Sequence, residues 1–314
     1  MTNQAIGLGC MGMSGTYGAT DDATSISVIQ AAIERGVTLI DTGDFYGMGH
    51  NEMLIGKAIA GRRDRVQLSV KFGALRGPDN SWGGLDMRPA AVKNFLAYSL
   101  RRLGTDVIDV YRPCRLDPQV PIEDTVGAIA DLIQQGYVKQ IGLSEVGIDT
   151  IRRAAKVHPI ADLQIEYSLV SRDPEDAIFP ALRELGIGAT LYGVLSRGLL
   201  SGSTIGARDY RAALPRFSAE HQATNGKLVA TVKALAAAWK LTPGQLAIAW
   251  ALAKQPGFVP VIGARTLAQL DDALAARPLS PAQVAELEAA VPRGAIAGTR
   301  YASHAMAQLD SEKR

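Results

Sequence analysis

Cysteine is scarce in this sequence of 314 residues, which contains two thiols, Cys10 and Cys114. Two cysteines so far apart indicate a reducing compartment and exclude a scaffold held together by several disulfides. Runs of 18 uncharged apolar residues are also lacking, and the opening residues MTNQAIGLGC do not combine a basic segment with a long apolar one. We therefore expect no membrane span, no signal peptide and a cytoplasmic location.

Charge of one sign is not in excess either. The chain has 33 Lys and Arg residues against 31 Asp and Glu residues, a net charge of +2, and the two signs are interspersed. It has no basic stripe of the kind that binds nucleic acid or an anionic membrane. We expect a small-molecule partner, with no nucleic acid, no membrane and no bound metal ion.

Hydrophobic residues make up 47% of the chain and follow a regular order. Short apolar runs, rich in β-branched residues, alternate with longer segments whose apolar residues recur at helical spacing. The eight runs begin near Ala5, Val37, Val66, Val107, Val138, Ala161, Ile187 and Phe258. This strand–helix repeat predicts an α/β fold, a single (β/α)8 TIM barrel over residues 1–314. The polar segment from Ser201 to Asn225 predicts a long loop after the seventh strand, a mobile flap over a site.

The stretch GLGCMG, from Gly7 to Gly12, has the spacing of the dinucleotide-binding fingerprint of a Rossmann fold. That fingerprint requires a helix to begin at its last glycine, whereas the MSGTYGA that follows is typical of a loop. We therefore interpret these glycines as the exit of the first strand, beside the site.

Polar side chains follow the predicted strands at their carboxyl ends, where (β/α)8 barrels carry their active sites. The second strand ends in Asp41 and is followed by Tyr46, and the third ends in Lys71. An ammonium beside a phenol makes the phenol proton more available, and a carboxylate holds the ammonium in place and charged. The three residues therefore predict an acid–base site. The alternative is a structural ion pair between Asp41 and Lys71, with Tyr46 packed beside it.

Several motifs occur in the order and spacing of one family. They include LIDTGDFYG, SVKFG, RLDPQVPIEDTVGAI, GYVKQIGLSEV, LYGVLSRGLLSG and VIGARTLAQLDDAL. On these motifs the sequence resembles the aldo-keto reductases, from Gly7 to the final helices. The resemblance implies a barrel that binds a nicotinamide cofactor without a Rossmann domain and reduces aldehydes or ketones to alcohols. Asp41, Tyr46 and Lys71 match three members of the family's catalytic tetrad, with Tyr46 as the proton donor.

The resemblance also implies a set of cofactor-binding residues. Ser144 and Gln164 match positions that hold the nicotinamide carboxamide, and Tyr192 matches the ring that stacks on it. Arg265 and Gln269 match positions at the adenosine 2′-phosphate and the adenine. NADPH is favoured over NADH because a guanidinium supplies permanently charged donors to a phosphate. The full predicted set is Met11, Gly12, Asp41, Ser144, Gln164, Tyr192, Gly193, Leu195, Ser196, Arg197, Gly198, Gly263, Arg265, Gln269 and Asp272.

Some positions near the expected cofactor depart from the family's pattern. Glu145 stands where many members carry Asn, and Asp272 stands where Asn commonly meets the adenine. Gly193 and Val194 replace a small polar residue and a proline.

The most consequential departure is Cys114, which stands before Arg115 where the family supplies the histidine of its tetrad. A neutral thiol is a weaker donor than imidazole and fills less space, so the carbonyl loses a positioning contact and the pocket gains room. A nucleophilic cysteine needs a base, and the one credible activator nearby is Lys71, so we expect no covalent catalysis. We expect Tyr46, Cys114 and Trp82 to line the substrate pocket.

The sequence thus predicts an NADPH-dependent oxidoreductase that reduces an aldehyde or ketone by direct hydride transfer, with Tyr46 as the proton donor. Oxidation of an alcohol with NADP uses the same residues in reverse. The alternative is a nicotinamide-binding barrel with a regulatory or redox-sensing role and little turnover. The combination of Asp41, Tyr46 and Lys71 favours the enzyme.

Overall fold

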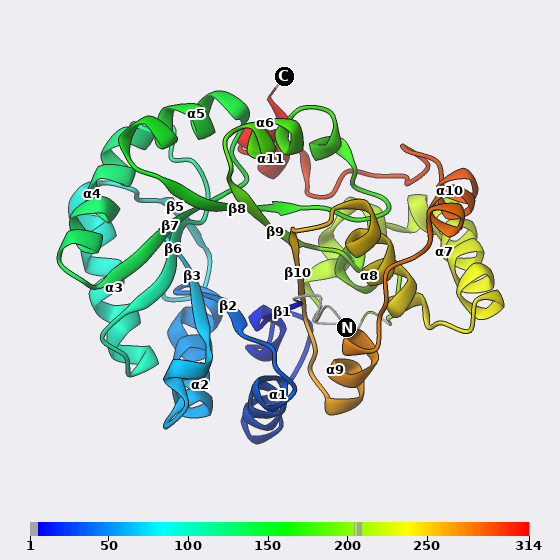
Figure 1. Ribbon diagram of the computed structural model, residues 1–314, viewed down its shortest axis with the longest axis horizontal. Coiled ribbons are helices and arrows are strands. Elements are labelled where there is room, and N and C mark those ends of the chain that lie inside the picture. Colours follow the sequence, from blue (N-terminus) through cyan, green and yellow to red (C-terminus); the bar gives the residue numbers. More distant parts are fainter. Residues whose placement is uncertain (1–5, 204, 206–208, 314) are drawn as a thin grey trace.

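The computed structural model describes residues 6–203, 205 and 209–313. At its centre is a closed barrel of parallel strands in the order β1-β10-β9-β8-β7-β6-β3-β2 (Figure 1). The barrel strands are β1 (Gly7–Gly9), β2 (Leu39–Gly43), β3 (Gln67–Phe72), β6 (Ile108–Pro113), β7 (Val138–Ser144), β8 (Ile160–Glu166), β9 (Gly188–Tyr192) and β10 (Val259–Ile262). The predicted (β/α)8 barrel is confirmed, and each of the eight predicted strands contributes to it.

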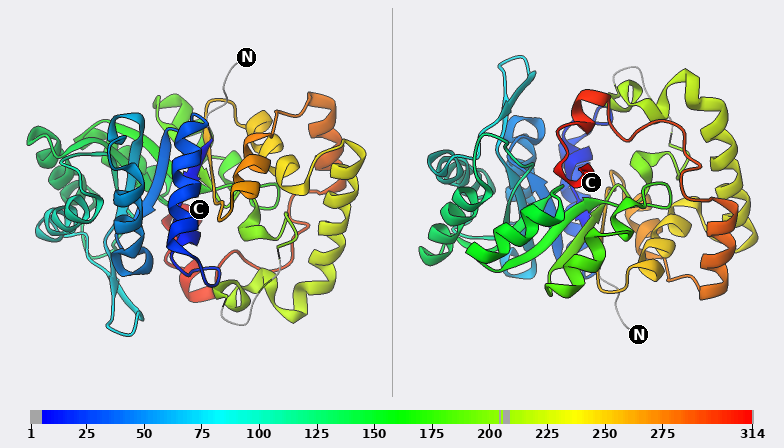
Figure 2. Two further views of the ribbon diagram at one scale, coloured as in Figure 1. Left: turned by 90° about the horizontal axis from the view of Figure 1, so that it is seen from below. Right: turned by 90° about the horizontal axis from the view of Figure 1, so that it is seen from above.

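Helices surround the barrel on its outside (Figure 1). They are α1 (Asp22–Glu34), α2 (His50–Ile59), α3 (Pro89–Leu103), α4 (Ile122–Gln134), α5 (Ile148–Val157), α6 (Ile178–Glu184), α7 (Ala219–Ala238), α8 (Pro243–Lys254), α9 (Leu267–Leu274) and α10 (Pro281–Ala290), whereas the short α11 (Ser303–Met306) lies at the end of the barrel where the strands finish (Figure 2). Two of them begin with a capping box, in which Thr242 pairs with Gln245 and Ser280 pairs with Gln283. Such reciprocal bonds satisfy backbone N–H groups that a helix start leaves unpaired.

Side chains leave the strands alternately toward the helices and toward the barrel interior. On the helix side, Tyr111 stacks on Phe72 with ring centroids 4.1 Å apart and donates a hydrogen bond to the carbonyl of Val92 in α3. On the interior side, successive strands present polar residues that bond to one another, described below. The outward layer supplies the apolar core, because burying each large apolar side chain contributes about 1.5–3 kcal/mol.

A two-stranded hairpin that the sequence did not predict follows the third barrel strand. It consists of β4 (Ala74–Arg76) and β5 (Trp82–Leu85), which pair antiparallel. The hairpin, the segment after β9 and the C-terminal segment (residues 295–313) project from the same end of the barrel (Figure 2). This is the end at which the strands finish, and we call it the mouth.

The prediction of a long loop from Ser201 to Asn225 is wrong for the final part of this range. Helix α7 begins at Ala219, and two short 3-10 helices precede it, Tyr210–Ala213 and Pro215–Phe217. Residues 204 and 206–208 of the expected loop lie outside the described residues. Asn225 suggested a loop, but it is a buried helical residue whose amide donates to the carbonyl of Ala297. Its role is to attach α7 to the C-terminal segment, a tertiary contact that local sequence does not reveal.

Candidate active site

A buried ion pair lies at the mouth of the barrel. Lys71, near the end of β3, places its Nζ 2.5 Å from Oδ1 of Asp41 in β2. The other oxygen of Asp41 accepts hydrogen bonds from Ser69 Oγ (2.8 Å) and from Gln164 Nε2 (2.7 Å). The amide of Gln164 also donates to Thr190 Oγ1 (3.3 Å). The structure therefore brings the predicted pair together and adds two donors that fix the carboxylate in place.

The contacts of Asp41 continue into a ring of polar side chains inside the barrel, most of which the sequence did not predict. Arg112 of β6 donates from Nη2 to Ser69 Oγ (3.0 Å) and forms an ion pair with Asp162 of β8 (3.1 Å). Thr190 of β9 donates to Asp162 Oδ2 (2.8 Å). A connected network of this kind restricts the positions of its members. The ring consists of Asp41, Ser69, Arg112, Asp162, Thr190 and Gln164.

Tyr46 follows β2 in a tight turn. Gly47, Met48 and Gly49 of this turn have φ angles of 56°, 53° and 92°, in the left-handed region that favours glycine. The turn places the Tyr46 ring beside Lys71, whose Nζ is 5.1 Å from the ring centroid. The structure thus joins Tyr46 to the ion pair, and the strained backbone at Met48 is typical of a functional site.

The protonation of Tyr46 differs from what the sequence led us to expect. Burial raises the pKa of Tyr46 well above its ordinary value, and the charge of Asp41 raises it further. Burial also lowers the pKa of Lys71, an effect that Asp41 opposes. Lys71 was expected to lower the pKa of Tyr46, but this effect is not dominant, because the cost of desolvating the phenolate form of Tyr46 is larger. Tyr46 keeps its proton in the neutral range, as a proton donor requires.

Cys114 lies immediately after β6, with its backbone N–H bonded to the carbonyl of Phe72 (2.9 Å). The side chain is buried and free of any disulfide, and burial raises the pKa of the thiol to about 12. Cys10 is also buried and free. At neutral pH the Cys114 thiol is therefore protonated, which agrees with a weak donor rather than with a nucleophile.

The residues expected at the nicotinamide lie at the ends of neighbouring strands. Ser144 ends β7, and its buried hydroxyl has no hydrogen-bond partner among the described residues. Gln164 of β8 uses its amide on Asp41, as described above. Tyr192 ends β9 and donates to Glu145 Oε1 (2.7 Å). The hydroxyl of Ser144 is thus available to a ligand, whereas the other two polar groups already have partners.

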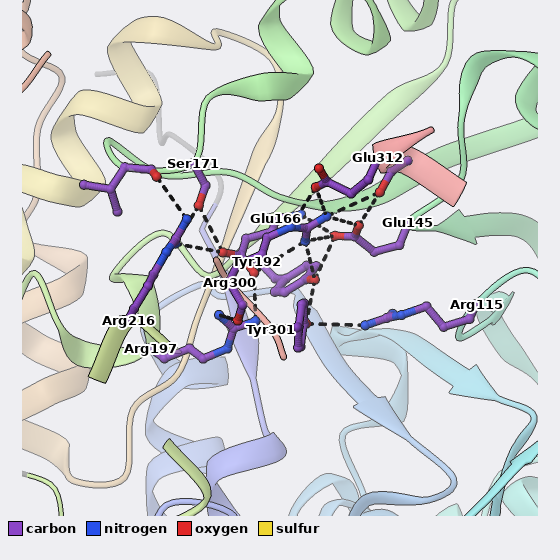
Figure 3. A network of polar contacts seen from close by, with 12 residues as sticks. Arg115, Glu145, Glu166, Ser171, Tyr192, Arg197, Arg216, Arg300, Tyr301 and Glu312 are labelled. Carbon is purple, nitrogen blue, oxygen red and sulfur yellow. Dashed lines mark hydrogen bonds and ion pairs between the residues drawn. The ribbon is translucent and has the colours of Figure 1, made fainter. Parts of the chain in front are cut away.

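A network of charges that the sequence did not predict lies beside these residues (Figure 3). Arg300 of the C-terminal segment binds Glu145 with both terminal nitrogens, Nη1 to Oε1 at 2.8 Å and Nη2 to Oε2 at 2.6 Å. Glu312 accepts a further bond from Arg300 Nη2 (2.7 Å), and Tyr192 and Tyr301 share a hydrogen bond of 3.0 Å. The positive charge of Arg300 holds the pKa of Glu145 well below its usual range despite burial. Glu145 therefore anchors the C-terminal segment across the mouth.

The segment after β9 joins the same network. Arg197 donates to Glu166 Oε2 (2.7 Å), and its guanidinium lies 4.5 Å from the centroid of the Tyr301 ring. Ser196 and Arg197 have positive φ angles of 47° and 54°, and the buried hydroxyl of Ser196 has no partner in the described part of the chain. Gly193 has a φ of 70°, and a side chain there would meet Glu166. These contacts explain why glycine follows Tyr192 in this chain.

Arg265, expected at the 2′-phosphate, lies after β10 at the mouth. Its Nη1 donates to the carbonyl of Tyr17 (2.9 Å), and its backbone N–H donates to Gln269 (2.8 Å). The side chain of Arg265 lies beside Gly12, and its Cδ is 3.7 Å from the position that a Cβ added to Gly12 would occupy. Within the described residues, no carboxylate forms an ion pair with Arg265. Its charge is therefore free to bind an anionic ligand.

Two predicted site residues make contacts of a different kind. Asp272 accepts hydrogen bonds from Thr242 Oγ1 (2.9 Å) and Gln245 Nε2 (3.0 Å) at the start of α8. Trp82 lies on the hairpin, is 49% exposed, and has the guanidinium of Arg76 5.5 Å from its ring centroid. Asp272 thus contacts the residues that cap α8, and Trp82 is an exposed residue of the hairpin.

Two observations concern ligand classes other than a nicotinamide. Across residues 6–203, 205 and 209–313, no group of three or more His, Cys, Asp or Glu side chains could hold a metal ion. None of the described helices combines the length and the apolar character that crossing a membrane requires.

A parallel (β/α)8 barrel with a phenol, an ammonium and a carboxylate gathered at its mouth has the features of an enzyme active site. Comparisons with known proteins agree with this class. The aldo/keto reductase family matches residues 5–292. A probable aldo-keto reductase from Glycine max is 42% identical over 307 residues, which are 94% of this chain and 88% of that protein.

Two solved structures extend the comparison. A glycerol dehydrogenase from Gluconobacter oxydans has a TM-score of 0.82 and 25% identity, with 94% of each chain covered. An aldo/keto reductase from Klebsiella pneumoniae, solved with NADP and acetate, has a TM-score of 0.73 and 27% identity, covering 95% of this chain and 94% of the other. The chain belongs to the aldo/keto reductase family, whose members are NADP(H)-dependent oxidoreductases.

Proposed function

We propose that this protein reduces an aldehyde or a ketone to an alcohol with NADPH, and that Tyr46 supplies the proton. The observation that carries the proposal is the arrangement at the mouth, where Lys71 Nζ lies 2.5 Å from Asp41 and 5.1 Å from the centroid of the Tyr46 ring. The related structure from Klebsiella pneumoniae, which contains NADP, supports the cofactor.

The described side chains fit a phosphorylated nicotinamide dinucleotide. The buried hydroxyls of Ser144 and Ser196 have no partner among the described residues, and the guanidinium of Arg265 has no carboxylate partner there. Unpaired buried polar groups are costly unless a ligand or water completes them. We expect Ser144 to hold the nicotinamide carboxamide, Ser196 to face the pyrophosphate and Arg265 to bind the 2′-phosphate.

The chain's own residues then perform the proton transfer. When bound, the reduced nicotinamide supplies a hydride to the carbonyl carbon. Tyr46 donates a hydrogen bond to the carbonyl oxygen and gives up its proton as negative charge develops on that oxygen. Lys71 stabilises the phenolate that remains, and Asp41 keeps Lys71 in position. Cys114 leaves room beside the carbonyl without polarising it strongly.

A scan of NADPH consumption against a panel of aldehydes, ketones and sugars tests this proposal. We expect consumption that depends on the added carbonyl compound and yields the matching alcohol. Binding of NADPH without consumption on any member of the panel would contradict the proposal, and it would favour a barrel that binds the cofactor for regulation or redox sensing.

A further inference from the structure

Arg115 carries a guanidinium at the mouth that lacks an acidic partner. It follows Cys114, and its Nη1 donates to the carbonyl of Cys114 at 2.6 Å. Its Nη2 lies 3.4 Å from the hydroxyl of Tyr301, a long contact. In the part of the chain that the structure describes, no carboxylate lies within 4.0 Å of this guanidinium. The side chain is half-buried, so its charge is only partly solvated.

Four other cations around the proposed catalytic residues are paired with carboxylates. The pairs are Lys71 with Asp41 (2.5 Å), Arg197 with Glu166 (2.7 Å), Arg216 with Glu166 (3.4 Å) and Arg300 with Glu145 (2.6 Å). Arg265 also lacks a carboxylate, and we have assigned it to the cofactor phosphate. The charge of Glu145 acts on Arg115, but both oxygens of Glu145 accept hydrogen bonds from Arg300. A partly buried charge without a direct carboxylate partner is unfavourable, which makes Arg115 a position that attracts an anion.

The barrel topology separates Arg115 from Arg265. Arg115 follows β6 and Arg265 follows β10, and these strands lie four places apart in either direction around the eight-stranded barrel. The two unpaired guanidinium groups therefore stand on opposite sides of the mouth. If Arg265 binds the cofactor phosphate, Arg115 lies on the side away from that phosphate, next to Cys114.

Arg115 is close to the groups that perform the chemistry. Its side chain points toward Tyr301 (Figure 3), whose hydroxyl is 3.0 Å from the hydroxyl of Tyr192. Its positive charge also opposes the rise in the pKa of Tyr46. An anionic group held by Arg115 would therefore lie near the carbonyl that Tyr46 protonates.

We infer that Arg115 binds an anionic group of the substrate, so that the preferred carbonyl compounds carry a carboxylate or a phosphate close to the carbonyl. This inference rests on the proposed carbonyl reduction. The planar guanidinium matches both anions, and its Nε–H and remaining Nη–H donors face no carboxylate among the described residues.

The test uses pairs of carbonyl compounds that differ in charge. Succinic semialdehyde is compared with its methyl ester, and glyceraldehyde phosphate with glyceraldehyde, as substrates of the full-length protein with NADPH. We expect kcat/KM for the charged member of at least one pair to exceed that of the neutral member by about tenfold or more. The pair that shows the preference identifies the anion as a carboxylate or a phosphate.

Substitutions at Arg115 then assign the preference to this residue. Arg115→Met removes the charge and keeps much of the side-chain length, so the charged-to-neutral ratio should fall to near one. Arg115→Lys keeps the charge and should retain part of the ratio. Arg153→Met is the matched control, because it removes the same charge from an exposed pair with Glu123 on the outer helices and should leave the ratio unchanged.

A measurement on the unsubstituted protein keeps the inference testable if Arg115→Met does not fold. Succinate should inhibit competitively with the carbonyl substrate, and dimethyl succinate should not. The inference would be overturned if the unsubstituted protein showed no charge preference, or if folded Arg115→Met kept the same charged-to-neutral ratio. In either case, reduction of the neutral compounds would still uphold the proposed function. No reduction of any of the four compounds, or of the wider panel, would contradict the proposed function and the inference with it.

Discussion

Arg112 and Asp162 form an ion pair inside the barrel, with Nη2 of Arg112 3.1 Å from Oδ1 of Asp162. The side chain of Arg112 is fully buried. The same guanidinium donates to Ser69 (3.0 Å), which donates to Asp41 (2.8 Å). The pair is therefore connected through one hydroxyl to the carboxylate that holds Lys71, and it helps to fix the geometry of Asp41 and Lys71.

We predict that Arg112→Met destabilises the protein by about 3–5 kcal/mol, because it leaves the carboxylate of Asp162 buried without its cation. The double substitution Arg112→Met with Asp162→Leu should recover most of this loss, since it removes both charges. Urea unfolding of the two variants measures the difference. Equal stability of the single and double variants would show that the charge of Asp162 does not need Arg112.

A second prediction concerns Asp44, a buried carboxyl three residues after Asp41. Burial, with the nearby charge of Glu52, raises the pKa of Asp44 from its ordinary value of 3.8 to about 8. Between these two values the folded protein holds a proton that the unfolded chain has released. The contribution of Asp44 to stability is therefore fully present below about pH 4 and is lost as the pH rises to 8.

Asp44→Asn removes this titration while keeping a neutral polar side chain. The free energy of unfolding of the unsubstituted protein should fall relative to this variant between pH 5 and 8, by up to about 1.4 kcal/mol per pH unit. Denaturant unfolding at several pH values measures the difference. Asp79→Asn, in the exposed turn of the hairpin, is the control and should show no such trend. A parallel pH dependence for Asp44→Asn and the unsubstituted protein would mean that Asp44 is ionised when folded.

The third prediction tests the cofactor contact of Arg265. Arg265→Ala should weaken NADPH binding by roughly 1.5–3 kcal/mol, because it removes a charge-assisted hydrogen bond to the 2′-phosphate. NADH lacks that phosphate, so its affinity should change little. Fluorescence titration with both cofactors measures the two effects, and an equal loss for NADPH and NADH would remove Arg265 from this role.

The fourth prediction concerns Cys114, whose thiol is buried and protonated at neutral pH. Cys114→Ala should keep most of the activity, because a neutral thiol contributes little as a donor. Cys114→His should shift preference toward small carbonyl compounds, since the imidazole restores a donor but overpacks a pocket for bulky ones at a cost of about 1–3 kcal/mol. Values of kcat/KM on the best carbonyl compound decide this. A collapse of activity in folded Cys114→Ala that still binds NADPH would show that the thiol takes part in the chemistry.

The barrel could be predicted from the sequence because its strands are buried on both sides and therefore form clear apolar runs. The hairpin was missed because its strands are short and one of them, WGGL, is half glycine. The start of α7 was missed because Asn is a residue type common in loops, whereas Asn225 packs within a helix and bonds to the C-terminal segment.

The convergence of Asp41, Tyr46 and Lys71 could be predicted because these residues stand at or just after strand ends within recognisable motifs. The ion pairs Arg112–Asp162 and Arg300–Glu145 could not be predicted. Arg112 and Asp162 are 50 residues apart and Arg300 and Glu145 are 155 apart. Single polar residues in apolar strands carry no local signal of their partners, which the barrel alone brings together. Glu145 was noticed as a departure from the family, but its partner lies in a C-terminal segment without a motif.

The central claim is that Tyr46 donates the proton, and Tyr46→Phe tests it most directly because it keeps the ring and removes the hydroxyl. NADPH affinity by fluorescence titration and kcat on the best carbonyl compound are measured on the same preparation. We expect nearly unchanged NADPH affinity and a kcat lowered by about 100-fold or more. A kcat near that of the unsubstituted protein would contradict the account and place the proton donor elsewhere.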